Sequence, residues 1–252
     1  MDTELDFNCD LGEGCGSDAA IIALISSANI ACGFHAGDAA SMRDTVALCR
    51  QHGVAIGAHP SLRDREGFGR REVMVTPDTT YADTREQLDA LAEIACAQGA
   101  RVEHLKPHGA LYNIAAREPV IAQAIARATR DFDRDMRLVG LSGSALTAAG
   151  EAAGLQVAHE AFAERRYEAD GTLTPRSQPG AVLETVEEAL QQVLRLLREG
   201  VVIARTGERI GVRMDTLCLH GDRPDALAFA QALQQTLQAE GVRIQSSRTA
   251  RP

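Results

Sequence analysis

The sequence predicts an α/β fold in which parallel strands alternate with helices that cover them. First, short apolar runs alternate with amphipathic stretches along the 252 residues, and a hydrophobic content of 45% is enough for a sizeable core. Second, a glycine follows most of the helical stretches and is itself followed by a strand-like run. Third, polar residues collect directly after the predicted strands, which is where ligands bind in parallel α/β proteins.

Each element is predicted from its apolar pattern and its boundary. The short apolar runs predicted to be strands are Leu5–Asp10, Ala28–Cys32, Val54–His59, Val102–Pro107, Arg137–Leu141, Leu155–Ala161 and Thr216–Leu219. The amphipathic stretches predicted to be helices are Asp18–Ser26, Ala40–His52, Thr80–Gln98, Pro119–Asp131, Ser144–Ala153, Leu183–Glu199 and Pro224–Glu240. Most of these helices end where a left-handed residue is wanted, before Gly53, Gly99, Gly154, Gly200 and Gly241.

The connections indicate one domain. Val201–Val212 is predicted to be a small hairpin before the last strand, and Arg166–Gly180 is predicted to be a long loop. No linker divides the chain, so we place a single domain over residues 1–245 and a disordered tail over 246–252. About seven strand–helix units in one domain suggest a barrel, incomplete or distorted. An open doubly wound sheet is the alternative.

Composition excludes several classes of partner. The net charge of −9 and the pI near 5.3 argue against a nucleic-acid partner held by phosphate contacts. No apolar run approaches the roughly 20 residues that span a bilayer, and the acidic N-terminus does not resemble a signal peptide. The six cysteines show no C-x-x-C pairing. We therefore expect a reduced, cytoplasmic protein.

Rare residue types concentrate in a few segments. Lys106 is the only lysine among 26 Lys and Arg residues, and the asparagines are Asn8, Asn29 and Asn113. Arginine is planar and always charged, whereas the pKa of a compact lysine amine can be tuned. Position 106 is therefore predicted to need an amine.

Polar side chains follow most of the predicted strands at the point where each strand ends. Because the carboxyl ends of parallel strands meet on one face, we expect a single polar pocket there. Carboxylates and histidines together suit general acid–base catalysis or a divalent metal. In chain order the residues are Asp10 and Glu13, His35 and Asp38, His59, Lys106 and His108, Glu160 and Arg165, and His220 and Asp222.

Spacing limits which histidines share a metal. His104 and His108 would lie about 13 Å apart on an extended strand, so they cannot hold one ion together. Lys106 and His108 are two residues apart, which places them on one face at roughly 6–7 Å. Both can therefore face the pocket. The candidate metal ligands are Asp10, His35 and His59.

Arginine-bearing loops could close on an anion. The segment Gly67-Phe68-Gly69-Arg70-Arg71 delivers two arginines after the third strand, as a lid over a carboxylate or phosphate or as an ordinary surface loop. Arg165 and Arg176 could likewise bind an anion or lie on an ordinary surface loop. The chain has no G-x-x-x-x-G-K-[ST] motif and no G-x-S-x-G motif, so a P-loop nucleotide site is not predicted and no serine nucleophile is indicated.

Six sequence blocks resemble those of a known family. They are FNCDLGEG at 7–14, ANIACGFHAGD at 28–38, GAHP at 57–60 with GFGRR at 67–71, KPHGALYN at 106–113, FAERRY at 162–167 with DG at 170–171, and CLHGD at 218–222. In this order, across nearly the whole chain, they resemble the LamB/YcsF lactam-utilisation family. One departure is Glu164, where an aspartate is expected.

The resemblance implies a fold, an activity and partners. The fold would be a distorted, seven-stranded β/α barrel similar to those of glycoside hydrolases and polysaccharide deacetylases. The activity would be that of an ATP-dependent 5-oxoprolinase, which opens 5-oxo-L-proline (pyroglutamate) to L-glutamate while ATP is hydrolysed to ADP and phosphate. The partners would be subunits B and C. Because this chain has no recognisable nucleotide motif, we expect B and C to phosphorylate the lactam and this chain to add water.

In that scheme, Asp10 or His59 is the expected water-activating base, and Lys106 and His108 would stabilise the developing oxyanion or the phosphate. Arginines would hold the substrate carboxylate, and asparagines would fix its orientation. The substrate-binding candidates are Asn8, Glu13, Asn29, His35, Asp38, Arg70, Arg71, Asn113, Arg165, Arg176, His220 and Asp222.

Three other interpretations compete with this one. Lys106 could be the nucleophile of a Schiff-base lyase or aldolase. The chain could be a metal-dependent amidase or deacetylase that cleaves a carbon–nitrogen bond without ATP. It could also be a non-catalytic protein of the complex that only binds the lactam.

Overall fold

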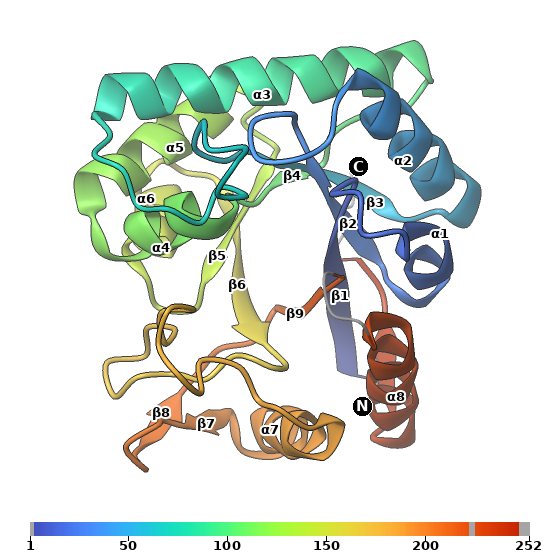
Figure 1. Cartoon of the computed structure of the whole chain (residues 1–252), viewed down its shortest axis with the longest axis vertical. Helices are drawn as coiled ribbons and strands as arrows, with labels where there is room; N and C mark the ends of the chain where they lie inside the picture. Colours follow the sequence, from blue (N-terminus) through green and yellow to red (C-terminus); the bar gives the residue numbers. More distant parts are fainter. Residues whose placement is uncertain (1–2, 222–224, 247–252) are drawn as a thin grey trace.

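Seven parallel strands close into a barrel in the computed structural model, which describes residues 3–221 and 225–246 (Figure 1). The strands are β1 (Thr3–Leu11), β2 (Ser27–Ala31), β3 (Ala55–His59), β4 (His104–Leu105), β5 (Arg137–Leu141), β6 (Gln156–Phe162) and β9 (Thr216–His220). β1 pairs with β2 on one side and with β9 on the other, which closes the circle. The predicted barrel is confirmed, and the open sheet is excluded.

A further strand lies at the opposite end of the barrel from the polar loops. β10 (Val242–Ile244) pairs in parallel with Thr3–Leu5 at the start of β1, while β9 takes over the pairing from Asp6 onward. The sequence analysis did not predict this strand, because a three-residue strand that follows a helix and pairs only at one edge carries almost no apolar pattern.

Helices surround the strands on the outside (Figure 1). They are α1 (Asp18–Ile21), the 3₁₀ turn η1 (Ile22–Leu24), α2 (Ala39–His52), α3 (Pro77–Ala97), α4 (Gly109–Arg117), α5 (Pro119–Phe132), α6 (Ala145–Ala152), α7 (Val186–Glu199) and α8 (Ala226–Ala239). α3 packs against α2 and α5, and α5 packs against α6. None of the helices in the described part of the chain is both long and apolar enough to cross a bilayer.

The predicted helix boundaries agree with the structure where capping residues define the helix ends. α2 begins at Asp38, whose side chain accepts hydrogen bonds from the backbone N–H groups of Ala40 and Ser41, and it ends at Gly53 with a φ of 68°. α7 has a capping box from Thr185 and ends at Gly200. The predicted first helix is shorter, because it divides into α1 and η1.

Three other predictions have specific outcomes. The hairpin before the last strand is confirmed as β7 (Val201–Ile203) paired antiparallel with β8 (Arg209–Gly211). α4 was not predicted, because its polar and glycine-containing start is typical of a loop after the fourth strand. The start of the predicted last helix at Pro224 and residues 247–252 of the predicted tail lie outside the described residues.

The alternation along β1 separates a polar interior from an apolar exterior. Phe7, Cys9 and Leu11 belong to the hydrophobic core between barrel and helices. Asp6, Asn8 and Asp10 instead make hydrogen bonds with polar side chains from other barrel strands. Successive side chains of a strand point to opposite faces, so the interior of this barrel is a hydrogen-bonded polar column that leads up to the site.

Candidate active site

A cavity of about 290 Å³ opens at the carboxyl ends of the barrel strands. This is close to the lower end of the range found for small-molecule sites. The strand-end prediction is confirmed, because residues from the ends of five strands, β1, β3, β4, β6 and β9, meet in one pocket. The sequence-predicted residues that line it are Asp10, His59, Arg70, Lys106, His108, Asn113, Arg165, Arg176 and His220.

Lys106 is buried at the bottom of this cavity, with 2% of its surface exposed. Its ammonium nitrogen lies 2.8 Å from Glu160 Oε1 and 3.1 Å from Asp10 Oδ1. Burial would lower the pKa of Lys106, but the negative charges of Asp10 and Glu160 outweigh burial and hold that pKa well above its usual value. The lysine is therefore a fixed positive charge between two carboxylates.

The two carboxylate oxygens of Asp10 have different neighbours. Its Oδ1 accepts hydrogen bonds from Asn29 Nδ2 at 2.9 Å and from Lys106 Nζ at 3.1 Å. Its Oδ2 lies 3.3 Å from His59 Nε2. Burial would raise the pKa of Asp10, but positive charge beside it, the Lys106 ammonium included, outweighs burial and holds that pKa well below its usual range.

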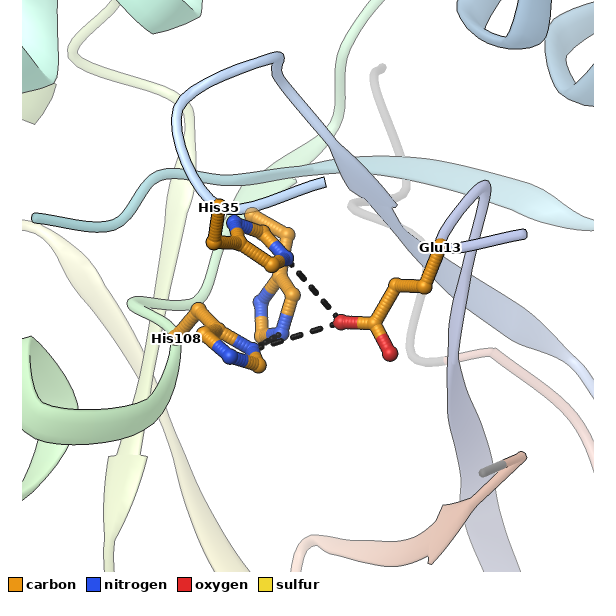
Figure 2. A group of neighbouring side chains, drawn as sticks. Glu13, His35 and His108 are labelled. Carbon is orange, nitrogen blue, oxygen red and sulfur yellow. Dashed lines mark hydrogen bonds and ion pairs between the residues drawn. The ribbon is translucent and has the colours of Figure 1, made fainter. Parts of the chain in front are cut away.

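Three histidines and a carboxylate form a cluster beside Asp10. Figure 2 shows the Glu13 carboxylate facing both His35 and His108, with Oε1 3.0 Å from His35 Nε2 and 3.3 Å from His108 Nδ1. His59 Nε2 approaches His108 Nδ1 to 2.9 Å, and the rings of His35 and His108 stack with centroids 3.8 Å apart. Burial is the main reason that the pKa of His35 falls to about 3. We call Glu13, His35, His59 and His108 the histidine cluster.

A second histidine–carboxylate pair lies beside Asp10, because His220 is the register partner of Asp10 on the neighbouring strand β9. His220 Nδ1 contacts Glu164 Oε1 closely, and the His220 ring stacks on Phe162 at a centroid distance of 5.7 Å. This pairing fixes the ring, and a ring nitrogen of His220 lies within 4.8 Å of ligand atoms of Asp10 and Cys218. Glu164, the residue that departs from the family pattern, thus reaches the histidine with its longer side chain.

The arginines divide into pocket residues and loop supports. Arg70 and Arg176 line the cavity. Arg71 instead donates through Nε and a terminal nitrogen to Oδ1 of Asp64, which also accepts from the Gly67 backbone N–H at 2.9 Å. Arg165 is buried and donates to the Thr174 carbonyl at 2.6 Å. Arg71 and Arg165 therefore shape the two loops around the pocket.

Three more predicted binding residues lie away from the cavity surface. Asn8 and Asn29 lie below the pocket inside the barrel, where Asn8 Oδ1 accepts from Asn29 Nδ2 at 2.8 Å and from Lys106 Nζ at 3.2 Å. Asp38 caps α2. His104 lies in the same lower layer as the asparagines and bonds Asn29 Oδ1 at 2.9 Å, which confirms that it does not share an ion with His108. Asp222 lies outside the described residues.

Several residues of the site were missed by sequence reasoning. Glu160 stood at a predicted strand end but was given no role, although it is the shortest-distance partner of Lys106. Cys218 Sγ lies 3.0 Å from Lys106 Nζ, and burial keeps its pKa well above its usual value, so it is a thiol here. Tyr112 and Phe162 complete the wall. Among these residues, only Glu160 has a position in the sequence, at the end of a predicted strand, that could have identified it as part of the site.

The fold and the pocket together define a β/α-barrel protein equipped for acid–base chemistry at the carboxyl ends of its strands. The sequence identifies the family of this chain more narrowly. The chain belongs to the LamB/YcsF family, whose sequence model matches residues 5–251.

Individual proteins agree with this assignment. The chain is 50% identical to the A subunit of 5-oxoprolinase from Bordetella pertussis (strain Tohama I), over 98% of this chain and 100% of that one. It is 43% identical to the lactam utilization protein of Thermus thermophilus, whose crystal structure superposes with a TM-score of 0.89 over 97% of this chain and 100% of that one. A structure described as a T48 deacetylase with substrate shares the fold alone, at 11% identity and a TM-score of 0.52 over 96% and 87% of the two chains.

Proposed function

We propose that this chain is the lactam-hydrolysing subunit of an ATP-dependent 5-oxoprolinase, which converts 5-oxo-L-proline to L-glutamate while ATP becomes ADP and phosphate. One observation carries the proposal. A small pocket that joins Asp10, Lys106 and two sets of histidines to rim arginines occurs in a chain 50% identical, over 98% of its length, to a protein named as the A subunit of 5-oxoprolinase.

The chemistry explains why ATP and partners are needed. A lactam is a poor electrophile, so transfer of a phosphoryl group from ATP to the lactam oxygen would create a leaving group and release ADP. Water then adds to the ring carbonyl carbon, the ring C–N bond breaks, and the nitrogen takes up a proton to give an acyl phosphate. A second water releases phosphate and L-glutamate. Because the chain lacks a P-loop motif, subunits B and C carry out the phosphoryl transfer.

The side chains in the pocket match the two proton transfers. Asp10 accepts the proton of the attacking water through Oδ2, the oxygen that Lys106 and Asn29 leave available. His220, which Glu164 orients on the strand next to that of Asp10, gives a proton to the ring nitrogen. Lys106 opposes the negative charge that develops beside Asp10.

The rim suits the two anionic groups of the activated substrate. Arg70 and Arg176 line the cavity, as Arg165 does, but Arg165 supports a loop, so the first two would hold the substrate carboxylate and the phosphate. Asn113 lies on the same wall and orients the ring. A divalent cation at the histidine cluster is a second cofactor that we propose for this site. We also propose a cytoplasmic location, because none of the six cysteines, all of which the structure describes, forms a disulfide.

The test is reconstitution of the complex. Subunits B and C are assayed for glutamate release from 5-oxo-L-proline with ATP, with and without this chain. We expect release to require both ATP and this chain, and ADP and glutamate to form together. Glutamate release by this chain alone without ATP would instead favour the metal-dependent amidase, and full activity of B and C alone would reject a catalytic role.

One observation disfavours the Schiff-base alternative. A lysine nucleophile must be an uncharged amine, whereas Lys106 is held as an ammonium by Asp10 and Glu160. Borohydride treatment with a carbonyl compound is therefore expected to leave the chain unmodified, and a stable adduct at Lys106 would overturn this argument.

A further inference from the structure

We propose that Glu13, His35, His59 and His108 bind one divalent transition-metal ion of the Zn²⁺ type. Each offers one ligand atom, and the four atoms lie within 4.8 Å of one another. They come from four loops or strand ends that the chain brings together only by closing the barrel.

The separations match a coordination shell. Ligand atoms at about 2.0–2.1 Å from one tetrahedral ion lie roughly 3.3–3.4 Å from one another. In the cluster, Glu13 Oε1 is 3.0 Å from His35 Nε2 and 3.3 Å from His108 Nδ1, and His59 Nε2 is 2.9 Å from His108 Nδ1. The remaining pairs of ligand atoms lie within 4.8 Å, so side-chain movement toward a shared ion would complete the shell.

Backbone carbonyls fix which nitrogens carry hydrogen. His59 Nδ1 lies 2.7 Å from the Lys106 carbonyl, and His108 Nε2 lies 2.9 Å from the Phe68 carbonyl. A carbonyl oxygen only accepts, so each of these nitrogens donates its N–H. The opposite nitrogens, His59 Nε2 and His108 Nδ1, are then both lone-pair acceptors in the neutral rings.

Two lone pairs therefore face each other at 2.9 Å with no hydrogen between them. Carboxylate oxygens of Glu13 and Asp10 lie at 3.3 Å from these same two nitrogens and add further acceptors. A buried group of acceptors is unfavourable unless a cation lies among them. Metal-bound histidines commonly donate their other N–H to a backbone carbonyl, which is the arrangement seen here.

The loop that contains Phe68 and Gly69 packs against the histidine cluster in an uncommon backbone conformation. Phe68, whose carbonyl orients His108, has a φ of 55°, which is uncommon for a residue other than glycine. The next residue, Gly69, has a φ of 65°, and a Cβ there would lie 2.9 Å from atoms of both His35 and His108. The backbone is therefore held in a strained form where it positions the cluster.

The donor types select the class of ion. Three imidazoles and one carboxylate suit Zn²⁺ and its neighbours in the first transition row, whereas Mg²⁺ and Ca²⁺ prefer shells of oxygen. An ion here would lie beside Asp10, and it would supply a Lewis acid and an acidified water to the pocket. The role of the ion in the reaction rests on the proposed function, whereas the assignment of its ligands does not.

The test is metal binding by the whole chain without substrate or partner subunits. The purified protein is stripped with a chelator, loaded separately with Zn²⁺, Co²⁺ and Mg²⁺, dialysed and analysed by mass spectrometry for metal. We expect one Zn²⁺ or Co²⁺ per chain and no retained Mg²⁺, and we expect bound Co²⁺ to show a visible absorption spectrum of nitrogen and oxygen ligands. Loss of all Zn²⁺ and Co²⁺ on dialysis would overturn the proposal.

Variants locate the ion. Glu13→Gln and His35→Ala are expected to weaken Zn²⁺ affinity by at least about 100-fold, the upper end of what loss of an outer-shell partner costs. His52→Gln, at an exposed position in α2, is the matched control and should bind as the wild type does. Circular dichroism checks folding, and Glu13→Gln keeps the test decisive if His35→Ala unfolds. Wild-type Zn²⁺ affinity in the folded variants would reject this ligand set, while leaving glutamate release by the complex as a separate question.

Discussion

The buried charge of Lys106 gives the sharpest prediction about stability. Lys106→Met keeps most of the side-chain volume but removes the ammonium, which lies within 3.1 Å of Asp10 and 2.8 Å of Glu160. Both carboxylates are nearly or fully buried. Breaking a buried ion pair by removing one partner costs about 3–5 kcal/mol, because the other charge is left uncompensated. We expect a loss of that size in the free energy of unfolding.

A double-mutant cycle separates charge from packing. Glu160→Gln in the Lys106→Met background removes one of the stranded carboxylates, so part of the loss should return. We expect a coupling energy of about 1–3 kcal/mol between the two positions, measured by urea denaturation of the single and double variants. A loss below about 1 kcal/mol for Lys106→Met, or strictly additive effects, would refute the ion-pair account.

Three further predictions test other contacts. Gly57→Ala should destabilise the fold by about 1–3 kcal/mol, because its Cβ would overlap the buried His104 ring; an unchanged melting temperature would contradict this. Thr216→Val removes the donor at 2.6 Å from Asp6 Oδ2, so it should raise further a carboxyl pKa that burial already raises. A carboxyl with a raised folded pKa favours folding at low pH and loses that contribution as pH rises through the folded pKa. The stability deficit of Thr216→Val should therefore grow from about pH 4 to about pH 8 and approach about 1.5–3 kcal/mol, and a deficit that is larger in acid would be inconsistent. Asp38→Ala should cost about 1 kcal/mol through loss of the α2 cap and leave glutamate release unchanged, whereas a raised KM would return Asp38 to the binding residues.

The sequence predicted the site best where strand ends define it. His59, Lys106 and His220 each follow or end a barrel strand, and closure of the barrel brings them to one cavity as expected. The alternation of apolar and polar residues in β1 is also visible in the sequence, but the polar residue Asn8 was predicted to bind the substrate. Asn8 lies below the pocket because inward positions of a closed barrel form layers, and the cavity at the strand ends is lined from the layer above it.

Loop residues could not be placed in this way. Glu13 and His35 were predicted to share the polar pocket, but their direct contacts with each other and with His108 depend on the course of two loops, which sequence spacing does not give. Arg70 and Arg71 are neighbours in sequence, and only the fold shows that Arg71 turns to Asp64. The carboxylate of Asp38 serves a helix cap because it precedes α2 directly.

The steady-state rate of glutamate release by the complex containing Asp10→Asn tests the central claim most directly. Asp10→Asn removes the proposed base but keeps the shape, and His52→Gln serves as the matched control outside the pocket. The account predicts that kcat falls by about 10²–10⁴-fold, the usual contribution of a positioned acid or base, while complex assembly and folding stay intact. A kcat close to that of the wild type would show that this pocket does not carry out the hydrolysis.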